Sequence, residues 1–177
     1  MKKRTLIISV LLVAALALGI GYAALSDTLS INGTIKTDGA AMENTFDSLV
    51  YFTNATVTND PAVHITANVS AAYGGDEASY TITGMNAVGD EVTMEFVIHN
   101  AYSETVWVTL AAHDENPYKD YIQISNNYND TPIKIDSLDD AKFTITVTVI
   151  ELTNATIDDL VHNISFNVSD VDPASGN

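Results

Sequence analysis

The sequence of 177 residues contains no cysteine, so disulfide bonds and thiolate zinc sites are excluded. Basic residues are also scarce: seven lysines and arginines face 23 acidic residues, and the formal net charge is −16. A chain with this charge does not bind nucleic acid or an anionic membrane by electrostatic attraction. The charge fits the surface of a soluble extracellular protein. The alternative is cation binding, or a polymer whose self-repulsion is relieved by salt.

The motifs of common hydrolases are absent as well. A zinc peptidase needs two histidines one helical turn apart and a carboxylate that activates water, usually as His-Glu-x-x-His. The histidines of this chain are never closer than fourteen positions, and they are His64, His99, His113 and His162. No Gly-x-Ser-x-Gly elbow and no phosphate-binding glycine loop is present. The sequence therefore predicts no catalytic residue, no cofactor and no metal centre.

One long apolar run stands at the N-terminus, where three basic residues precede the uncharged residues 5–23. A basic segment, an apolar segment and small residues at its exit are typical of a secretory signal. Gly21 and Ala23 are the small residues three and one positions before a cut after Ala23. A cut after Ala24 would instead place the bulky Tyr22 in the outer small-residue pocket. The alternative is an uncleaved membrane anchor, because the run is nearly long enough to span a bilayer.

We therefore expect signal peptidase to release residues 1–23. The secreted chain would keep 154 of the 177 residues, with four basic residues against 23 acidic ones and a net charge of −19. Such a chain would have no contact with the membrane after cleavage.

The first alternating stretch follows the cleavage site directly. Polar residues fill the even positions from 28 to 34, and the odd positions carry Leu25, Leu29, Ile31, Gly33 and Ile35. This pattern predicts a strand with one apolar face over residues 24–36. A strand at a free terminus can add to the sheet of another copy, so we expect a donor strand, in which Gly33 lets the chain pass close to a bulky neighbour. Pairing within its own domain is the alternative.

The remaining chain, residues 37–171, is predicted to be one antiparallel, all-β sandwich. Residues 37–44 read as a small polar linker, no helical periodicity of useful length follows, and short alternating segments separated by turns are expected at 48–58, 62–71, 79–83, 91–100, 105–111, 121–125, 133–135, 142–150 and 163–170. The link at 101–104 is short enough for an antiparallel hairpin. Residues 172–177 are expected to form a flexible tail.

Two stretches carry a resemblance to a known family. Residues 86–110 read NAVGDEVTMEFVIHNAYSETVWVTL, in which the turn Val88-Gly89-Asp90 begins a strand of alternating apolar residues. Residues 21–27 read GYAALSD, a small-residue exit followed by Ala, a large apolar residue and Asp. Together they resemble the TasA/CalY (camelysin) family of secreted, fibre-forming proteins of the biofilm matrix. The resemblance implies a jelly-roll sandwich and donated-strand fibres.

On this basis we expect a secreted structural protein of the extracellular matrix or cell surface. It would polymerise head-to-tail with copies of itself into fibres or pilus-like filaments by donor-strand exchange, with other matrix components as further partners. The alternative is a monomeric cell-surface sandwich that binds a glycan or Ca²⁺. The family has been associated with a metallopeptidase label, but the histidine spacing of this chain argues against that activity.

Glycosylation, Ca²⁺ binding and aromatic binding are weaker hypotheses. Among seven Asn-x-Ser/Thr sequons, those expected on outward faces are at Asn68, Asn163 and Asn167. Oxygen-rich residues that could ligate Ca²⁺ gather at Asp130, Asp136, Asp139 and Asp140, without the Asp-x-Asp-x-Asp-Gly order, so a solvated acidic loop is the alternative. An aromatic patch, or else ordinary half-buried sheet residues, is expected of Tyr102, Trp107, Tyr118 and Tyr121.

We predict that the exported protein begins at Ala24, because the small residues Gly21 and Ala23 fit the cleavage pockets of signal peptidase. N-terminal sequencing or the intact mass of secreted protein checks this directly. Retention of residues 2–23 in the surface-bound form would indicate a membrane-anchored domain instead.

Overall fold

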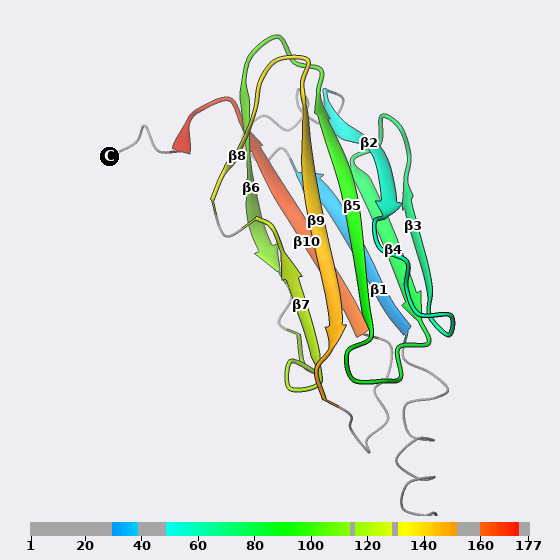
Figure 1. Cartoon of the computed structure of the whole chain (residues 1–177). Coiled ribbons are helices and arrows are strands. Elements are labelled where there is room, and N and C mark those ends of the chain that lie inside the picture. Colours follow the sequence, from blue (N-terminus) through cyan, green and yellow to red (C-terminus); the bar gives the residue numbers. More distant parts are fainter. Residues whose placement is uncertain (1–29, 39–48, 114–115, 129–130, 152–159, 174–177) are drawn as a thin grey trace, which may run out of the picture.

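The computed structural model describes residues 30–38, 49–113, 116–128, 131–151 and 160–173, and within these residues the chain is all-β with no α-helix (Figure 1). Ten strands are found there: β1 (Ser30–Asp38), β2 (Val50–Val57), β3 (Thr66–Ala71), β4 (Glu77–Thr83), β5 (Glu91–Asn100), β6 (Val106–His113), β7 (Ile122–Asn126), β8 (Ile133–Ile135), β9 (Asp140–Val149) and β10 (Leu160–Ser169).

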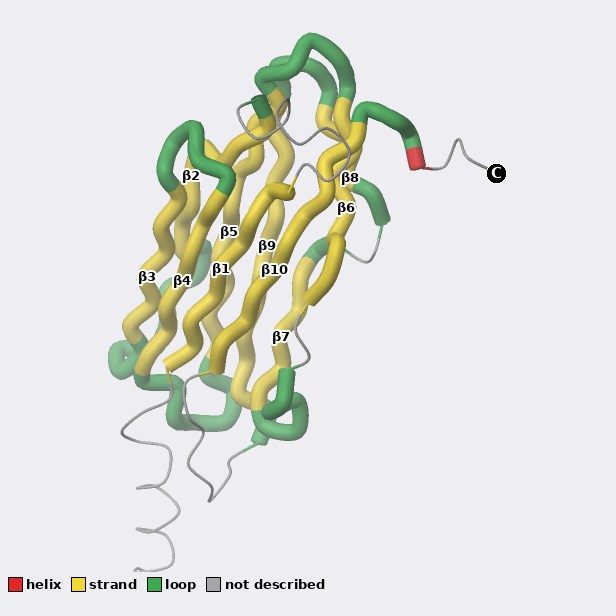
Figure 2. Tube along the Cα trace, turned by 180° about the vertical axis from the view of Figure 1, so that it is seen from behind, coloured by secondary structure: helices red, strands yellow, loops and turns green. Residues whose placement is uncertain are grey.

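The strands form two sheets that pack face to face as a sandwich (Figures 1 and 2). The larger sheet has six strands in the order β3-β4-β1-β10-β6-β8, and the smaller has four in the order β2-β5-β9-β7. Neighbouring strands are antiparallel with one exception, since β1 runs parallel to β10. The predicted all-β sandwich is therefore confirmed, whereas the expectation of a purely antiparallel arrangement was wrong for this pair.

Alternation in the sequence accounts for the strands and for the faces they bury. On β5 the side chains of Val92, Met94, Phe96 and Ile98 are buried and those between them are half-buried. The predicted bounds of the strands at 91–100 and 133–135 are confirmed, as are the predicted ends at residues 71 and 83, and the remaining ends differ by a few residues. The largest difference is at β3, which begins at Thr66 rather than at residue 62; β10 begins at Leu160, three residues early, and β1 extends to Asp38.

The predicted hairpin at residues 101–104 was wrong, because β5 and β6 lie in different sheets. The fully buried Asn100 at the end of β5 directs this crossing. Its Nδ2 group donates to the carbonyl oxygens of Glu104, Ile135 and Asp136 at 2.9, 3.1 and 3.2 Å. A buried amide must be satisfied, and these partners tie the end of β5 to the start of β6 and to the β8–β9 loop. The sequence shows the short link but not the partners of Asn100.

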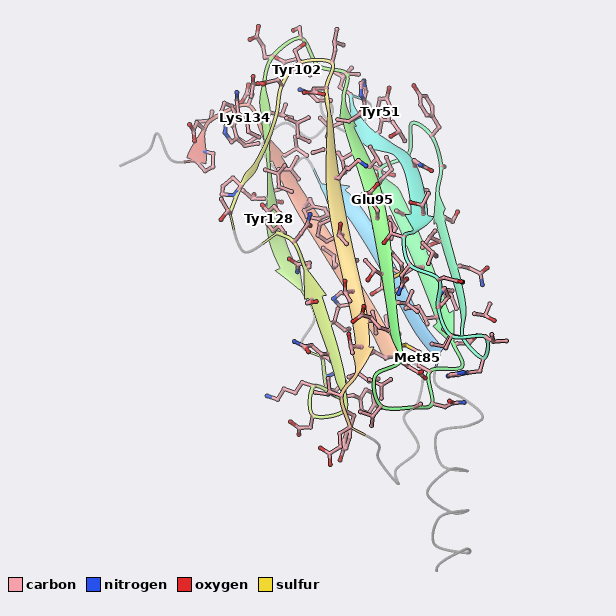
Figure 3. All side chains as sticks on the ribbon, in the orientation of Figure 1. Tyr51, Met85, Glu95, Tyr102, Tyr128 and Lys134 are labelled. Atoms are coloured by element: carbon pink, nitrogen blue, oxygen red, sulfur yellow. The ribbon has the colours of Figure 1, made fainter. Side chains whose placement is uncertain are left out.

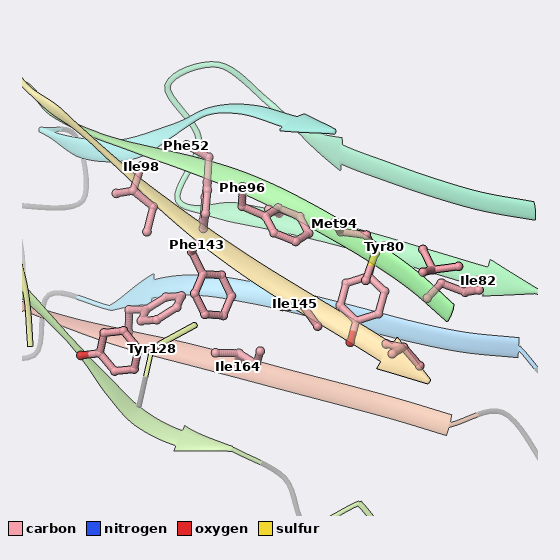
Figure 4. Packing of buried hydrophobic residues seen from close by; sticks show 14 of the residues in the cluster. Phe52, Tyr80, Ile82, Met94, Phe96, Ile98, Tyr128, Phe143, Ile145 and Ile164 are labelled. Atoms are coloured by element: carbon pink, nitrogen blue, oxygen red, sulfur yellow. The ribbon is translucent and has the colours of Figure 1, made fainter. Parts of the chain in front are cut away.

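Aromatic side chains fill the middle of the core between the sheets (Figure 4). Phe143 of β9 packs edge-on against Phe166 of β10, with ring centroids 4.9 Å apart, and so joins the two sheets. Phe96 and Tyr128 extend this contact on either side, at 6.4 Å from Phe143 and 5.7 Å from Phe166. Edge-to-face pairs of this kind add stabilisation to the area that they bury. Alternation within the expected strands places eight residues on the apolar faces, and all eight are buried: Phe96, Ile98, Val108, Phe143, Ile145, Val147, Ile164 and Phe166.

We predict that Ile145→Ala lowers the free energy of unfolding by about 2–5 kcal/mol, because the side chain is fully buried and its removal leaves a cavity. Denaturant unfolding measures the loss. Ile150→Ala is the matched control: Ile150 follows β9 and is 43% exposed, so we expect a change within about 0.5 kcal/mol. Equal losses for the two variants would mean that the faces of β9 are assigned wrongly.

Candidate functional site: the slot that holds the first strand

The first strand, β1, lies in the middle of the larger sheet (Figure 2). It is antiparallel to β4 over residues 30–36 and parallel to β10 over residues 31–38. We call the space between β4 and β10 that β1 fills the β1 slot. In a single copy of the chain the strand thus pairs within its own domain, as the alternative interpretation expected.

The odd-numbered residues of β1 are in register with core positions on both neighbouring strands. The residues aligned with Ile31 and Ile35 are all buried, and they are Ile82 and Ala78 of β4 and Leu160 and Ile164 of β10. Thr34, at an even position, is aligned with the exposed Ser79. Paired residues share a face of a sheet, so the odd positions of β1 belong to the core face, as the alternation predicts.

A hydrogen bond crosses the β1 slot on its core side. The hydroxyl of Tyr80 on β4 and Nδ1 of His162 on β10 are 2.5 Å apart, and both side chains are buried. In Figure 4 the Tyr80 ring extends from β4 across β1. Burial raises the pKa of Tyr80, so its hydroxyl stays protonated. The two strands that flank β1 are therefore linked to each other by their side chains.

Sequence reasoning missed this pair. The last strand was expected to begin at residue 163, whereas β10 begins at Leu160. Extending the alternation of Ile164, Phe166 and Val168 back by two positions would have placed His162 on the core face. Alternation within the expected strand at 79–83 places Tyr80 on the same face as Ile82, and both are buried, but nothing in the pattern shows that Tyr80 meets a residue 82 positions away.

The turn at Val88-Gly89-Asp90 is built around a buried carboxylate near the end of the β1 slot where β1 begins. Oδ2 of Asp90 accepts hydrogen bonds from the backbone N–H groups of Asn86 and Ala87 at 2.8 and 2.9 Å, and it lies 2.9 Å from Nε2 of His64. Burial alone would raise the pKa of Asp90, but the hydrogen bonds from His64, Ala87 and Asn86 outweigh it and hold the pKa below its ordinary value.

Close backbone packing fixes the same end of the sandwich. Gly84, which follows β4, has a φ of +85°, and a Cβ at this residue would lie 2.1 Å from the carbonyl oxygen of His64. Only glycine fits here, because the loop before β5 and the loop before β3 pack against each other with no room for a side chain. The turn Val88-Gly89-Asp90 therefore also holds the loop before β3, through the contact between Asp90 and His64.

Several residues singled out in the sequence lie outside the described part of the chain: Ala23 and Ala24 of the cleavage site, Leu25 and Leu29 of the donor strand, and Asp130. Among the sequons, Asn68 is exposed on the edge strand β3, Asn163 is in register with Thr34 of β1, and Asn167 is half-buried. Glycosylation at these positions stays a prediction.

The acidic and histidine residues form separate pairs rather than a common centre. Asp136 pairs with Lys134 at 2.7 Å and Asp140 with His99 at 2.7 Å, and both carboxylates are more than half exposed. In the described ranges no three His, Asp or Glu side chains are grouped in a way that could hold a metal ion. His113 belongs to β6. The arrangement is that of surface ion pairs around a packed core.

The four aromatic residues proposed as a patch do not form one group. Tyr118 and Tyr121 lie together in the turn before β7, where the N–H of Tyr121 donates a hydrogen bond to the carbonyl oxygen of Tyr118 at 2.8 Å. Tyr102 follows the end of β5, at the end of the sandwich opposite Met85 (Figure 3). The carbonyl oxygen of Tyr121 accepts a hydrogen bond from Ile150, which follows the end of the antiparallel strand β9. Trp107 is half-buried on β6 and paired with Lys134 of β8. All four are half-buried, so the alternative interpretation, ordinary half-buried residues, fits them better than a binding patch.

No family model matches this chain, and a comparison with curated proteins found no match. In the part of the chain that the structure describes, no helix is long and apolar enough to cross a membrane.

We predict that Asp90→Asn lowers the free energy of unfolding at neutral pH by about 1–3 kcal/mol. The substitution keeps the shape of the side chain but replaces the charged acceptor of these hydrogen bonds with a neutral amide. A carboxyl group whose folded-state pKa lies below its ordinary value of 3.8 stabilises the fold above that value and loses this effect as the pH falls through the folded-state pKa. The difference between wild type and variant should therefore narrow below about pH 4.

Denaturant unfolding at several pH values measures this difference, and Asp60→Asn, at an exposed carboxylate, is the control, with an expected change within about 0.5 kcal/mol. A difference for Asp90→Asn that stays constant down to pH 2 would contradict the role of the charge.

Proposed function

We propose that this chain is a secreted structural protein that polymerises by donor-strand exchange into extracellular fibres or pilus-like filaments. In the polymer, β1 of one copy occupies the β1 slot of the next. The residues of the donated strand are Leu25, Leu29, Ile31, Gly33 and Ile35, on its apolar face.

The observation that carries this proposal is the position of the first described strand at the centre of a sheet. Without β1, the larger sheet divides into the β3-β4 hairpin and a β10-β6-β8 group, and both β4 and β10 present unpaired backbone groups. The core residues Tyr80 and Ile164 would lose the strand that lies between them. An open edge of this kind, lined by apolar side chains, binds an added strand through main-chain hydrogen bonds.

Residues 39–49 separate β1 from β2 in the sequence. In the proposed exchange, β1 leaves its slot and is replaced there by the β1 of a second copy. A donor and an acceptor related head-to-tail do not close on themselves, so the product grows as a filament. The net charge opposes the approach of subunits, and added salt should speed the assembly.

Export and architecture belong to the same proposal. The apolar residues 5–23 with their small-residue exit support secretion, and the resemblance of residues 86–110 supports membership in the TasA/CalY family. From β5 onward each strand lies in the sheet opposite to that of the strand before it. Connections that repeatedly cross between the sheets support a jelly-roll-like topology.

A second candidate function is that of a monomeric cell-surface module that binds a glycan. It is favoured by β1 filling its own slot and by an exposed aromatic pair. The rings of Tyr51 and Tyr73 are 5.5 Å apart at an edge-on angle, Tyr73 is 77% exposed, and His99 packs against Tyr51 at 5.4 Å. Exposed aromatic rings of this kind offer apolar faces with polar tips.

We predict that a disulfide that holds β1 in its own slot prevents polymerisation. Thr34 and Ser79 are cross-strand partners, and the absence of native cysteine makes the Thr34→Cys/Ser79→Cys pair the only thiols. The oxidised variant should remain monomeric in light scattering and electron microscopy, and the reduced variant should form filaments. Filaments that are formed in reductant and then oxidised should give a ladder of covalent oligomers on a non-reducing gel.

The matched control is Ser70→Cys/Ser79→Cys, which shares Ser79 but joins β3 to β4, strands that are already connected. It should polymerise equally well oxidised and reduced. A wild-type chain that stays monomeric at every salt and protein concentration would contradict the proposal and favour the monomeric module. The proposal would also be contradicted if the oxidised Thr34→Cys/Ser79→Cys variant formed filaments as fast as the reduced one.

A further inference from the structure

Gly33 lies at the point where the Tyr80–His162 hydrogen bond crosses β1. In the antiparallel pairing Gly33 is aligned with Tyr80, and in the parallel pairing it is aligned with His162. The two partners of this one residue are therefore the two side chains that meet at 2.5 Å. Their rings are inclined edge-on, with centroids 6.3 Å apart.

Strand spacing explains why this position is a glycine. Neighbouring strands of a sheet are about 4.7–4.9 Å apart, so β4 and β10 are separated by about 9–10 Å with β1 between them. Side chains from aligned residues can meet over this distance only by passing across the core side of β1. A Cβ at residue 33 would point into that passage, because odd positions of β1 share the core face. Glycine otherwise weakens a strand, so its place between Ile31 and Ile35 needs such a reason.

We propose that the Tyr80–His162 pair sets the register of the strand that enters the β1 slot, and that the strand it fits is the β1 of a second copy, with Gly33 over the pair. This inference rests on the proposed function. Alternation alone rejects a slip by one residue, which would turn the apolar face to solvent. A slip by two residues keeps the apolar face inward, but it places Ile31 or Ile35 over the pair. Only the register with Gly33 over the pair leaves the passage open.

The test compares labelled peptides of residues 28–38, with the natural sequence or with Gly33→Val, each mixed with the full secreted chain. Fluorescence anisotropy reports the entry of each peptide into the slot. We expect the Gly33→Val peptide to enter at least tenfold less than the natural one. In a chain that carries Tyr80→Ala, or Tyr80→Leu if the first variant does not fold, the difference should fall below threefold. A Thr34→Val peptide is the control, since this position is aligned with the exposed Ser79, and it should enter like the natural one.

Equal entry of the natural and Gly33→Val peptides into the wild-type chain would overturn the inference and leave donor-strand exchange standing. A discrimination that persists in the Tyr80 variants would overturn it too. If no peptide enters the slot, donor-strand exchange itself is contradicted. The effect of the Tyr80–His162 pair on the register of β1 is then tested by denaturant unfolding of the full-length chain. Gly33→Val should then reduce the folding equilibrium constant at least tenfold in the wild type and by less than threefold beside Tyr80→Leu. Equal reductions in the two backgrounds would overturn the inference.

Discussion

Backbone pairing on both sides of β1 is the interaction on which the larger sheet depends. The strand joins the β3-β4 hairpin to the β10-β6-β8 group, and among the described strands no other pairing connects these two parts of the sheet. An isolated two-stranded hairpin is marginally stable in water, so β3 and β4 need β1 to become part of a sheet. The strand that does this is the first one in the described chain. Its central position makes it necessary to the larger sheet, and the proposed exchange would supply the same strand from a second copy.

A chain without cysteine must obtain its specificity from packing and from buried polar groups. Among the described side chains no buried nitrogen or oxygen atom lacks a hydrogen-bond partner. Asn100 fixes a crossing between the sheets, Asp90 holds the turn before β5 to the loop before β3, and His162 reaches Tyr80 across β1. Leaving any of these groups unpaired would cost free energy, so each one disfavours alternative connections and registers that apolar packing alone would tolerate.

The alternating residues of β5, β9 and β10 allowed the core of this protein to be predicted from the sequence. A period of two places every second side chain on one face, and for Phe96, Ile145 and Phe166 that face is the buried one. The same period predicted which positions of β1 align with the core. It said nothing of β1's two partners, because any strand edge with an apolar face satisfies the same rule. Nor did it reveal the Tyr80–His162 pair, since a tyrosine and a histidine are each compatible with a core or a surface position.

By itself, the sequence determined that the domain is built of strands, which face of most of them is buried, and that the first strand has an apolar side interrupted by Gly33. These properties follow from local backbone geometry and from side-chain chemistry. Only the tertiary structure decided that β5 and β6 part into different sheets, that β1 runs parallel to β10, and that Gly33 lies between Tyr80 and His162. These outcomes depend on residues brought together from distant parts of the chain, where hydrogen-bond partners and the room for a Cβ are set by the packed fold.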